Sequence, residues 1–390
     1  MTRPTNPRPT LFVLAGVVAA SLALAGCEQA ADDTAEPGSL RAAVMGTDPI
    51  PFAPERVADL GFDPDALLAL ATHAEEENST CFLVAREGQI VGEWYWRETD
   101  PDSTQEVFSA TKSVTGALVG IAEHDGDLAL TDRASRYIPQ WRGTASAKVT
   151  VRNLMSNDSG RFWSTKSDYT TLLHAKDRTG YAVGLKQQAK PGKVWAYNNA
   201  AIQALDRVIV TATGVETAEF AEDRLFDPLG MTRSRMTPDA AQASTNVYFG
   251  LQSTCRDLAR FGQFFAQDGE WEGEQLLAPE FVAASTAESS QKLNAAYGLL
   301  WWVNQAGPQR SPVDADNPGL PPGVDGVGQL APGAPEDLYA ALGYGGQVVL
   351  IDPSSQTVVV RLGAPGVRES FGYGFADGAD VITDALDTLG

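Results

Sequence analysis

The sequence predicts an α/β (α+β) protein in which an antiparallel sheet, built from both chain ends, is flanked by helices and has a helical domain inserted in it. Residues 81–96 read as two β-branched or aromatic segments around a glycine turn. Helical periodicity dominates from residue 109 to about 265, and strand-like segments return after residue 297. This order of strands, helices and strands predicts a mixed sheet closed by both ends of the chain.

The elements can be assigned along the chain. Asp63-Pro64 before an apolar helical face predicts a capped helix that packs on the core. A glycine turn at residues 86–89 joins the two strands of a predicted hairpin. Further helices are predicted at 200–213, 216–227, 254–265 and 376–389, further strands at 297–303, 346–352 and 357–362, and a long Pro- and Gly-rich surface loop at 306–335.

The chain is acidic and rich enough in apolar residues to fold around a large core. It has 390 residues, 43% of them hydrophobic, and a formal net charge of -21. A charge of this sign repels nucleic acid, so no nucleic-acid partner is expected. The His residues are scattered, and neither a His-Glu-x-x-His pair nor a Cys-x-x-Cys clip occurs, so no metal site is expected.

The amino terminus has the features of an export signal. Arg3 and Arg8 precede an apolar run at residues 11–26, which is shorter than the ~20 residues of a transmembrane helix. The run ends in Leu-Ala-Gly-Cys27, which resembles a bacterial lipobox and implies cleavage before Cys27 and lipid attachment to its thiol. The alternative is an ordinary secretory signal with an incidental cysteine.

Three segments follow from this assignment. Residues 1–26 are predicted to be the lipoprotein signal peptide, residues 27–52 a flexible tether, and residues 53–390 the folded domain, with a helical subdomain at roughly 110–290. The protein is then exported and lipid-anchored to a bacterial membrane on its periplasmic or extracellular face. An oxidising compartment would allow a disulfide between Cys81 and Cys255, although two separate buried thiols remain an alternative.

A lysine stands one helical turn after a serine in Ser109-Ala-Thr-Lys112, at the head of an apolar helix. The apolar positions between residues 114 and 122 form a stripe that should bury this helix and carry Lys112 inward. Burial favours the neutral amine, which can help to activate the Ser109 hydroxyl as a nucleophile. The alternative is a lysine that reaches solvent from a structural helix.

A second Ser-x-x-Lys, Ser289-Ser-Gln-Lys292, has a different setting. It lies in a polar run with no apolar helix behind it, so we expect a solvated loop.

Two later stretches complete a pattern. Tyr197-Asn-Asn199 lies before a predicted helix, and Tyr344-Gly-Gly opens a late strand. With Ser109-Ala-Thr-Lys112, these stretches resemble the three motifs of the serine β-lactamase and penicillin-binding-protein family, in motif order, over about residues 62–363. The class C, esterase and 6-aminohexanoate-dimer hydrolase branches are the most similar.

The resemblance implies a β-lactamase-like fold and a mechanism without cofactor or metal. Ser109 would attack a carbonyl to form an acyl-enzyme, with Lys112 and Tyr197 as shared general base. Asn199 would orient substrate or Lys112. The backbone N–H groups of Ser109 and Gln347 would form the oxyanion hole.

The substrate is expected to be a small-molecule or peptide-like ester or amide. Many family members carry a lysine or histidine where this chain has Tyr344, so an uncharged substrate is favoured beside Tyr344, Gly345 and Gly346. Tyr169 could contact the substrate or leaving group, as a tyrosine does in the aminohexanoate branch, or lie in a surface loop.

Several alternatives remain open at this point. Within the same family, the protein could be a penicillin-binding D,D-peptidase or a β-lactamase; outside catalysis, it could be an inactive binding or sensing lipoprotein. The α/β-hydrolase class is disfavoured because no Gly-x-Ser-x-Gly occurs.

Overall fold

The computed structural model describes residues 39–40, 48–286, 292–310, 324–364 and 373–386. The chain divides into two units, Met1–Ala35 and Glu36–Gly390, and the described residues all belong to the second. The predicted signal peptide and Cys27 lie outside the described residues, as do most of the predicted tether and Ser289.

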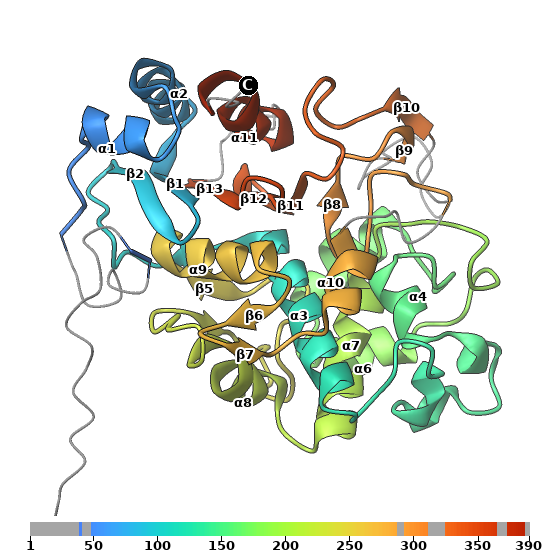
Figure 1. Cartoon of the computed structure of the whole chain (residues 1–390). Helices are drawn as coiled ribbons and strands as arrows, with labels where there is room; N and C mark the ends of the chain where they lie inside the picture. The colour runs from blue at the N-terminus through green and yellow to red at the C-terminus, as the bar shows by residue number, and fades with distance from the viewer. Residues whose placement is uncertain (1–38, 41–47, 287–291, 311–323, 365–372, 387–390) are drawn as a thin grey trace, which may run out of the picture. The chain divides into compact units, whose positions relative to one another are not determined.

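A six-stranded antiparallel sheet forms the centre of the described unit (Figure 1). Its strand order is β2-β1-β13-β12-β11-β8, so the amino-terminal hairpin pairs directly with the last strand. The predicted sheet built from both chain ends is therefore confirmed. The strands are β1 (Ser79–Arg86), β2 (Gln89–Tyr95), β8 (Trp302–Val303), β11 (Tyr339–Gly343), β12 (Gln347–Asp352) and β13 (Thr357–Gly363).

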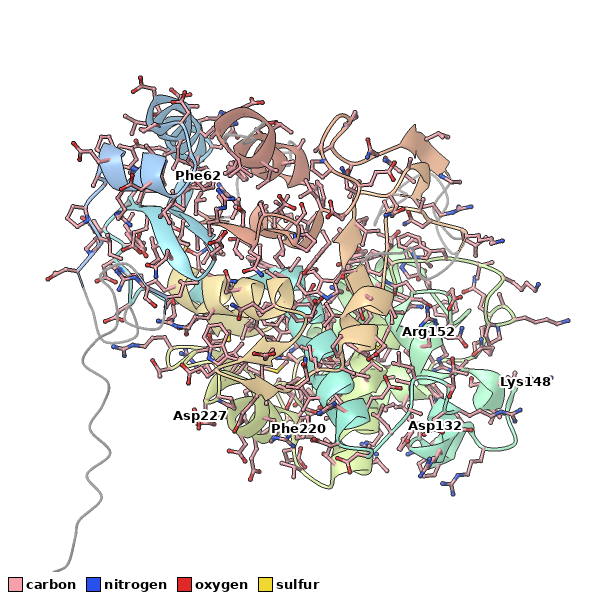
Figure 2. The ribbon with its side chains drawn as sticks, viewed as in Figure 1. Phe62, Asp132, Lys148, Arg152, Phe220 and Asp227 are labelled. Carbon is pink, nitrogen blue, oxygen red and sulfur yellow. A yellow bond between two sulfur atoms is a disulfide. The ribbon has the colours of Figure 1, made fainter. Side chains whose placement is uncertain are left out.

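Helices cover both faces of this sheet (Figure 1). One face packs against α2 (Pro64–Glu76) and α11 (Phe375–Asp380), near α1 (Pro54–Asp59). The other face packs against α9 (Cys255–Ala266) and α3 (Thr111–His124). Because every β-strand exposes alternate side chains to opposite faces, the sheet separates two hydrophobic cores. Phe62 belongs to the first core and Phe220 to the second (Figure 2).

The inserted helical part lies between β2 and β8 in sequence. Its longest helix, α7, packs against α3, α4 and α6, so α3, the helix that carries Lys112, lies between the sheet and the helical part. The helices here are α4 (Val151–Met155), α5 (Leu172–His174), α6 (Arg178–Gly184), α7 (Asn199–Thr213), α8 (Thr217–Ala221) and α10 (Pro279–Thr286). The short strands are β3 (Gln105–Glu106), β4 (Arg235–Met236), β5 (Leu251–Ser253), β6 (Glu270–Trp271) and β7 (Glu274–Gln275).

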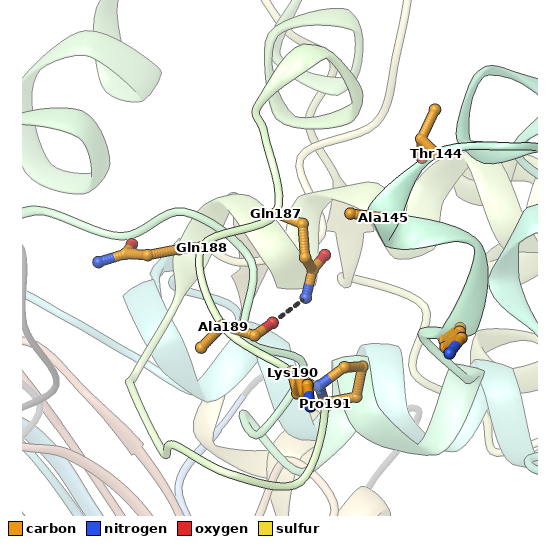
Figure 3. Close-up of a pocket in the computed structure, with 8 residues that line it drawn as sticks. Thr144, Ala145, Gln187, Gln188, Ala189, Lys190 and Pro191 are labelled. Carbon is orange, nitrogen blue, oxygen red and sulfur yellow. Dashed lines mark hydrogen bonds between the residues drawn. The ribbon is translucent and has the colours of Figure 1, made fainter.

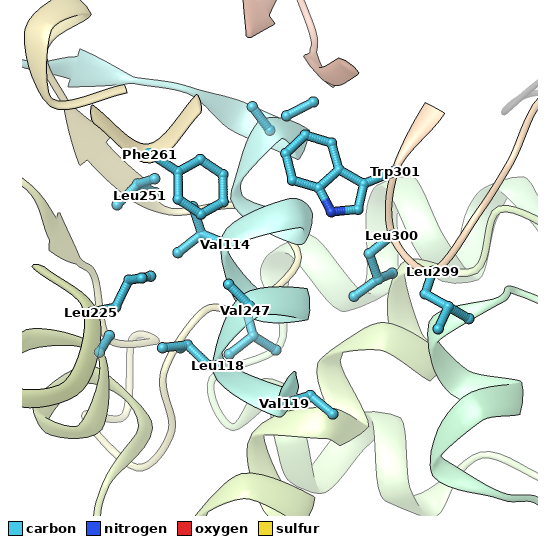
Figure 4. Packing of buried hydrophobic residues seen from close by; sticks show 14 of the residues in the cluster. Val114, Leu118, Val119, Leu225, Val247, Leu251, Phe261, Leu299, Leu300 and Trp301 are labelled. Carbon is cyan, nitrogen blue, oxygen red and sulfur yellow. The ribbon is translucent and has the colours of Figure 1, made fainter. Parts of the chain in front are cut away.

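The strand predicted at 297–303 is wrong over most of its length. Only β8, at its end, is a strand, because the backbone reverses at Leu300, whose φ is 65°. The reversal places the Trp301 ring in the core, where it stacks on Phe261 at 5.8 Å between ring centroids (Figure 4). Tertiary packing of one large aromatic ring thus outweighs the local strand propensity.

Two carboxyl-terminal predictions also need correction. The expected surface loop at 306–335 contains a hairpin, formed by β9 (Gly307–Arg310) and β10 (Val324–Gly328). The expected helix at 376–389 is α11 followed by a π-helical turn, Val381–Ala385, and residues 387–390 lie outside the described part.

The fold also brings together the two cysteines considered above. Cys81 lies in β1 and Cys255 begins α9, and their Cα atoms are 6.5 Å apart.

Within the described residues, no helix is both long and apolar enough to cross a bilayer. The same residues contain no group of three or more His, Cys, Asp and Glu side chains placed to hold a metal ion.

Candidate active site

Ser109 lies in a tight turn, Phe108–Ala110, that leads directly into α3. Phe108 has a φ of 48°, which is unusual for a bulky residue and indicates local strain. The Phe108 backbone is held on both sides: its N–H donates to Glu106 Oε1 at 3.1 Å, and its carbonyl accepts from Thr111 Oγ1 at 2.6 Å. The turn is therefore fixed by its neighbours, which makes the position of Ser109 well defined.

Helix α3 is buried along most of its length. Its Val114 and Leu118 side chains point into the core beside Leu225, Val247 and Phe261, as the apolar stripe predicts (Figure 4). Hydroxyl groups on the helix also bind the surrounding loops; Thr115 Oγ1, for example, donates to the Val247 carbonyl at 2.7 Å. These contacts fix the helix that carries the lysine.

Lys112 points into the site rather than toward solvent, since it is only 2% exposed. Its Nζ donates to Ser109 Oγ and to the Tyr248 carbonyl, both at 2.8 Å. Burial lowers the pKa of Lys112 to about 7, opposed by the negative charge of Asp168. A substantial fraction of the neutral amine at neutral pH, next to a hydroxyl, is the arrangement that general-base activation requires.

Tyr197 completes the cluster around the Ser109 hydroxyl. Its ring centroid lies 4.7 Å from Lys112 Nζ, and its hydroxyl is hydrogen-bonded to Ser109. Burial raises the pKa of Tyr197 above its ordinary value, so the phenol is neutral at neutral pH. Three further rings, those of Trp195, Tyr297 and Trp302, surround Tyr197 and fix its orientation.

The two asparagines that follow Tyr197 have different positions. Asn198 caps α7 by accepting from the Ala201 N–H at 2.8 Å. Asn199 is the first residue of the helix, is buried, and donates its backbone N–H to Asp168 Oδ2 at 2.6 Å. The ordinary capping role thus belongs to Asn198, which leaves the Asn199 side chain inside the site.

The strand side of the site is the turn Tyr344-Gly345-Gly346 between β11 and β12, with Gln347 as the first residue of β12. Gly343 lets this turn approach the nucleophile, because a Cβ there would lie 2.2 Å from the Val107 carbonyl oxygen. The Tyr344 ring packs edge-on against Phe108 at 5.6 Å and is 58% exposed. Both β11 and β12 contact the turn that carries Ser109.

A buried arginine holds this turn from behind. Arg361 Nη1 donates to the Gly345 carbonyl at 2.7 Å and to the Gly346 carbonyl at 2.9 Å, while Nε donates to Ser79 Oγ at 2.7 Å. The Gln347 side chain adds a bond from Nε2 to the Tyr344 carbonyl at 3.1 Å. Side chains from the sheet therefore hold the carbonyl groups of the turn in hydrogen bonds that direct them away from Ser109.

Tyr169 reaches the site, although part of it remains accessible. It is 36% exposed and lies in the π-helical turn Ser167–Thr171, and its hydroxyl is hydrogen-bonded to the Asn199 side chain. Burial of the hydroxyl raises the pKa of Tyr169, and the neighbouring Asp168 charge raises it further. Tyr169 therefore lies between the solvent-exposed edge of the site and the Asn199 side chain.

The sequence did not reveal three residues that the structure places here. Asp168 is 1% exposed and faces Lys112; Tyr248 supplies the carbonyl that accepts from Lys112; Arg361 anchors the strand turn. A signal existed only for Asp168, as the acidic neighbour of Tyr169 in Ser167-Asp-Tyr-Thr.

A surface hollow of about 370 Å³ lies elsewhere, between the 3-10 helix Ala145–Lys148 and residues 187–191 (Figure 3). Gln187 closes part of it by donating to the Ala189 carbonyl at 2.7 Å. None of the residues that line this hollow belongs to the cluster around Ser109. We therefore assign the chemistry to the buried cluster rather than to the hollow.

Fold and relatives together define a serine hydrolase. The Beta-lactamase family model matches residues 70–364, and the chain belongs to that family. The family inferred from the three motifs is thereby confirmed.

The relatives include several hydrolases. The 6-aminohexanoate-dimer hydrolase of Paenarthrobacter ureafaciens is 21% identical over 352 residues, covering 82% of this chain and 81% of that protein. A penicillin-binding protein of Bacillus subtilis is 24% identical over 279 residues, or 58% of this chain and 57% of that one.

Solved structures show the same fold. A family VIII carboxylesterase superposes with a TM-score of 0.62 at 15% identity, covering 87% of this chain and 98% of its own. A penicillin-binding protein homologue from Caulobacter crescentus gives 0.61 at 17% identity, covering 86% and 98%.

Proposed function

We propose that this protein is an exported esterase or amidase that cleaves uncharged substrates through an acyl-enzyme on Ser109. The single observation that carries the proposal is the 2.8 Å contact between Lys112 Nζ and Ser109 Oγ inside a buried cluster. The lysine takes the serine proton as the hydroxyl attacks the substrate carbonyl. Tyr197, hydrogen-bonded to the same hydroxyl, donates its phenolic proton to the leaving group and regains a proton from Lys112, after which the two groups activate water for deacylation.

The oxyanion that forms during attack needs two hydrogen-bond donors. The backbone N–H groups of Ser109 and Gln347 are the proposed pair, because β12 begins at Gln347 and contacts the turn that carries Ser109. Arg361 and the Gln347 side chain bind the neighbouring carbonyls, which keeps these oxygens away from the developing negative charge.

The proposed substrate class follows from the partly exposed rim of the site, which Tyr344 and Tyr169 form. Tyr344 and Tyr169 are partly exposed aromatic residues beside the cluster, and neither is a lysine, arginine or histidine. Such a rim favours an apolar or neutral acyl group over a carboxylate, which would require a cation at this position. An ester or amide of a neutral acid is therefore preferred to a carboxylated β-lactam.

Hydrolysis of p-nitrophenyl butyrate by the full chain and by Ser109→Ala tests the proposal. We expect turnover by the unchanged protein and near-background rates for Ser109→Ala, with Ser289→Ala, in the second Ser-x-x-Lys motif, as an active matched control. A fluorophosphonate probe should add its mass to Ser109 in the same samples.

Each outcome separates the alternatives. Probe labelling without ester turnover would point to a narrow peptidase; neither labelling nor turnover of esters, amides and penicillin would point to a binding lipoprotein. Equal activity in the Ser109→Ala variant would remove Ser109 as the nucleophile.

We also propose that Cys27 carries a lipid that anchors the exported chain to a bacterial membrane. The proposal rests on the lipobox-like sequence before Cys27. Metabolic labelling with radioactive palmitate should mark the expressed protein, and Cys27→Ala should abolish the label. Equal labelling of both forms would contradict the proposal.

A disulfide between Cys81 and Cys255 is proposed for the exported protein. The Cα separation of 6.5 Å is within the range that a disulfide spans. Replacing both cysteines by alanine should lower the free energy of unfolding by about 2–4 kcal/mol. Two reactive thiols in denatured, unreduced protein from an oxidising compartment would show that the bridge is not formed.

A further inference from the structure

Asp168 is a buried carboxylate in the centre of the site that the catalytic cycle proposed above does not use. It lies in the π-helical turn Ser167–Thr171 and is 1% exposed. Its Oδ2 accepts from the Asn199 N–H at 2.6 Å, and the Ala200 N–H also bonds to the carboxyl group. The start of α7, with its partial positive charge, therefore supports one side of this carboxylate.

The second oxygen of the carboxylate has no such support. Among the described residues, Oδ1 of Asp168 has no hydrogen-bond partner, which is costly for a buried carboxylate. Trp163 lies close by, but its indole N–H donates to the Tyr197 carbonyl at 3.0 Å. Because Oδ1 has no hydrogen-bond partner, the carboxylate of Asp168 influences its surroundings on that side through its charge.

That charge acts on the titratable groups of the site. It favours the ammonium form of Lys112 and disfavours the phenolate forms of Tyr197, Tyr169 and Tyr248. The groups around Lys112 are Ser109 on its own turn, Tyr197 before α7, Tyr248 before β5, and Asp168. Of the described residues, Asp168 is the carboxylate whose charge acts on the lysine.

We propose that Asp168 is a positioning residue that sets the protonation state of Lys112 and thereby the pH range in which Ser109 is activated. This proposal rests on the function proposed above. The negative charge of the ionised carboxylate favours the ammonium form of Lys112, so it raises the pH above which the free amine is available to accept the Ser109 proton. Without that charge, the free amine would form at lower pH.

Burial moves both groups toward the same pH range. The pKa of Lys112 is lowered to about 7, and burial raises the pKa of Asp168 to about 7, opposed by bonds from the start of α7. The two groups therefore titrate in the same pH range, and the charge of each one affects the protonation of the other.

The test is the pH dependence of Ser109 acylation by a fluorophosphonate, measured on the full chain with Asp168→Asn. Asparagine retains an oxygen that can accept from the Asn199 N–H, but it cannot ionise. Without the negative charge, the pKa of Lys112 falls, so the acid limb of the rate profile should move to lower pH by about one unit. Asp168→Glu, which keeps the charge, should leave the limb near its original pH.

Asp206 provides a matched control. It is also a buried carboxylate in the helical part, but it binds the hydroxyls of Thr179 and Thr217, both at 2.8 Å. Asp206→Asn should lower the melting temperature without moving the acid limb. Asp168→Ser serves the same test if Asp168→Asn does not fold.

An unshifted acid limb in a folded Asp168→Asn protein would overturn the proposal and reduce Asp168 to a structural support for α7. The same shift in Asp206→Asn would also overturn it. If the function proposed above were wrong instead, the result would be different, since Ser109→Ala would then still be labelled and active.

Discussion

The two sides of the site are built on different principles. On the helix side, Lys112 and Tyr197 are buried and ionisable, and both contact the partly exposed Ser109 or one another directly. The strand side, Tyr344-Gly-Gly, contains no basic or acidic side chain, is partly exposed, and is held through its carbonyls by side chains behind it. On the proposed mechanism, proton transfer takes place on the helix side, while the strand side holds the oxyanion donor and meets the acyl group. Substitutions on the helix side should therefore impair proton transfer, and those on the strand side should impair oxyanion stabilisation or change substrate choice.

The largest expected effect is on the helix side, with Lys112→Met. Loss of the base should lower kcat/KM for p-nitrophenyl butyrate by about a thousandfold. Lys292→Met, at the exposed lysine that ends the second Ser-x-x-Lys sequence, is the control and should retain full activity. A loss of less than tenfold would mean that Lys112 is not the principal base.

Arg361→Met should disturb the strand side of the site and leave the arrangement of the helix side unchanged. We expect kcat to fall by about 10- to 100-fold with KM changed little, because the turn can no longer hold the oxyanion donor in place. The acid limb of the pH profile should stay where it is.

Arg161 is the matched control for Arg361. It is likewise a buried arginine bonded to backbone carbonyls, those of Ala182 and Val183. Arg161→Met should lower the melting temperature and leave kcat of the folded protein unchanged. Equal losses of kcat in the Arg361 and Arg161 variants would show that only stability had been affected.

Tyr169→Phe should separate amide from ester cleavage. Removal of the hydroxyl that bonds to Asn199 is expected to lower amide hydrolysis by about tenfold, since the amine leaving group must be positioned by Tyr169 to accept its proton from Tyr197. p-Nitrophenyl esters have a good leaving group and should be cleaved at the original rate. Parallel losses for both substrate classes would instead indicate a disturbed site.

The smallest expected effect is in recognition. Tyr344→Lys places a cation on the exposed rim, where an ion pair contributes about 1 kcal/mol at most. The ratio of kcat/KM for a carboxylate-bearing ester to that for its neutral analogue should rise by about fivefold. An unchanged ratio would show that the acyl group does not reach Tyr344.

The sequence predicts those parts of the molecule whose signals are local. The apolar stripe after Lys112 predicts the burial of α3, and Asp63 caps α2 as expected from Asp63-Pro64. The reversal at Leu300 was missed because the burial of Trp301 depends on α9, which is distant in sequence.

The residues of the candidate site also divide into those that the sequence predicts and those that it does not. The Ser109–Lys112 pair follows from a spacing of one helical turn, and the structure has this contact. By contrast, Arg361 donates to backbone carbonyls and Tyr248 contributes its own backbone carbonyl as the acceptor for Lys112, and neither residue type nor spacing gives a signal for such bonds. Asp168 was missed because its meaning depends on burial beside Lys112, which only the packed structure provides.

The position of β1 next to β13 has a consequence for how the protein is made. Leu83 pairs with Val360, so the central sheet cannot close until nearly the whole chain has left the ribosome. Contacts so distant in sequence also slow folding, because the ends of a long loop must first meet. In a newly made chain this sheet therefore stays open until synthesis is almost finished, which is compatible with the export proposed above and delays assembly of the site around Ser109 until that stage.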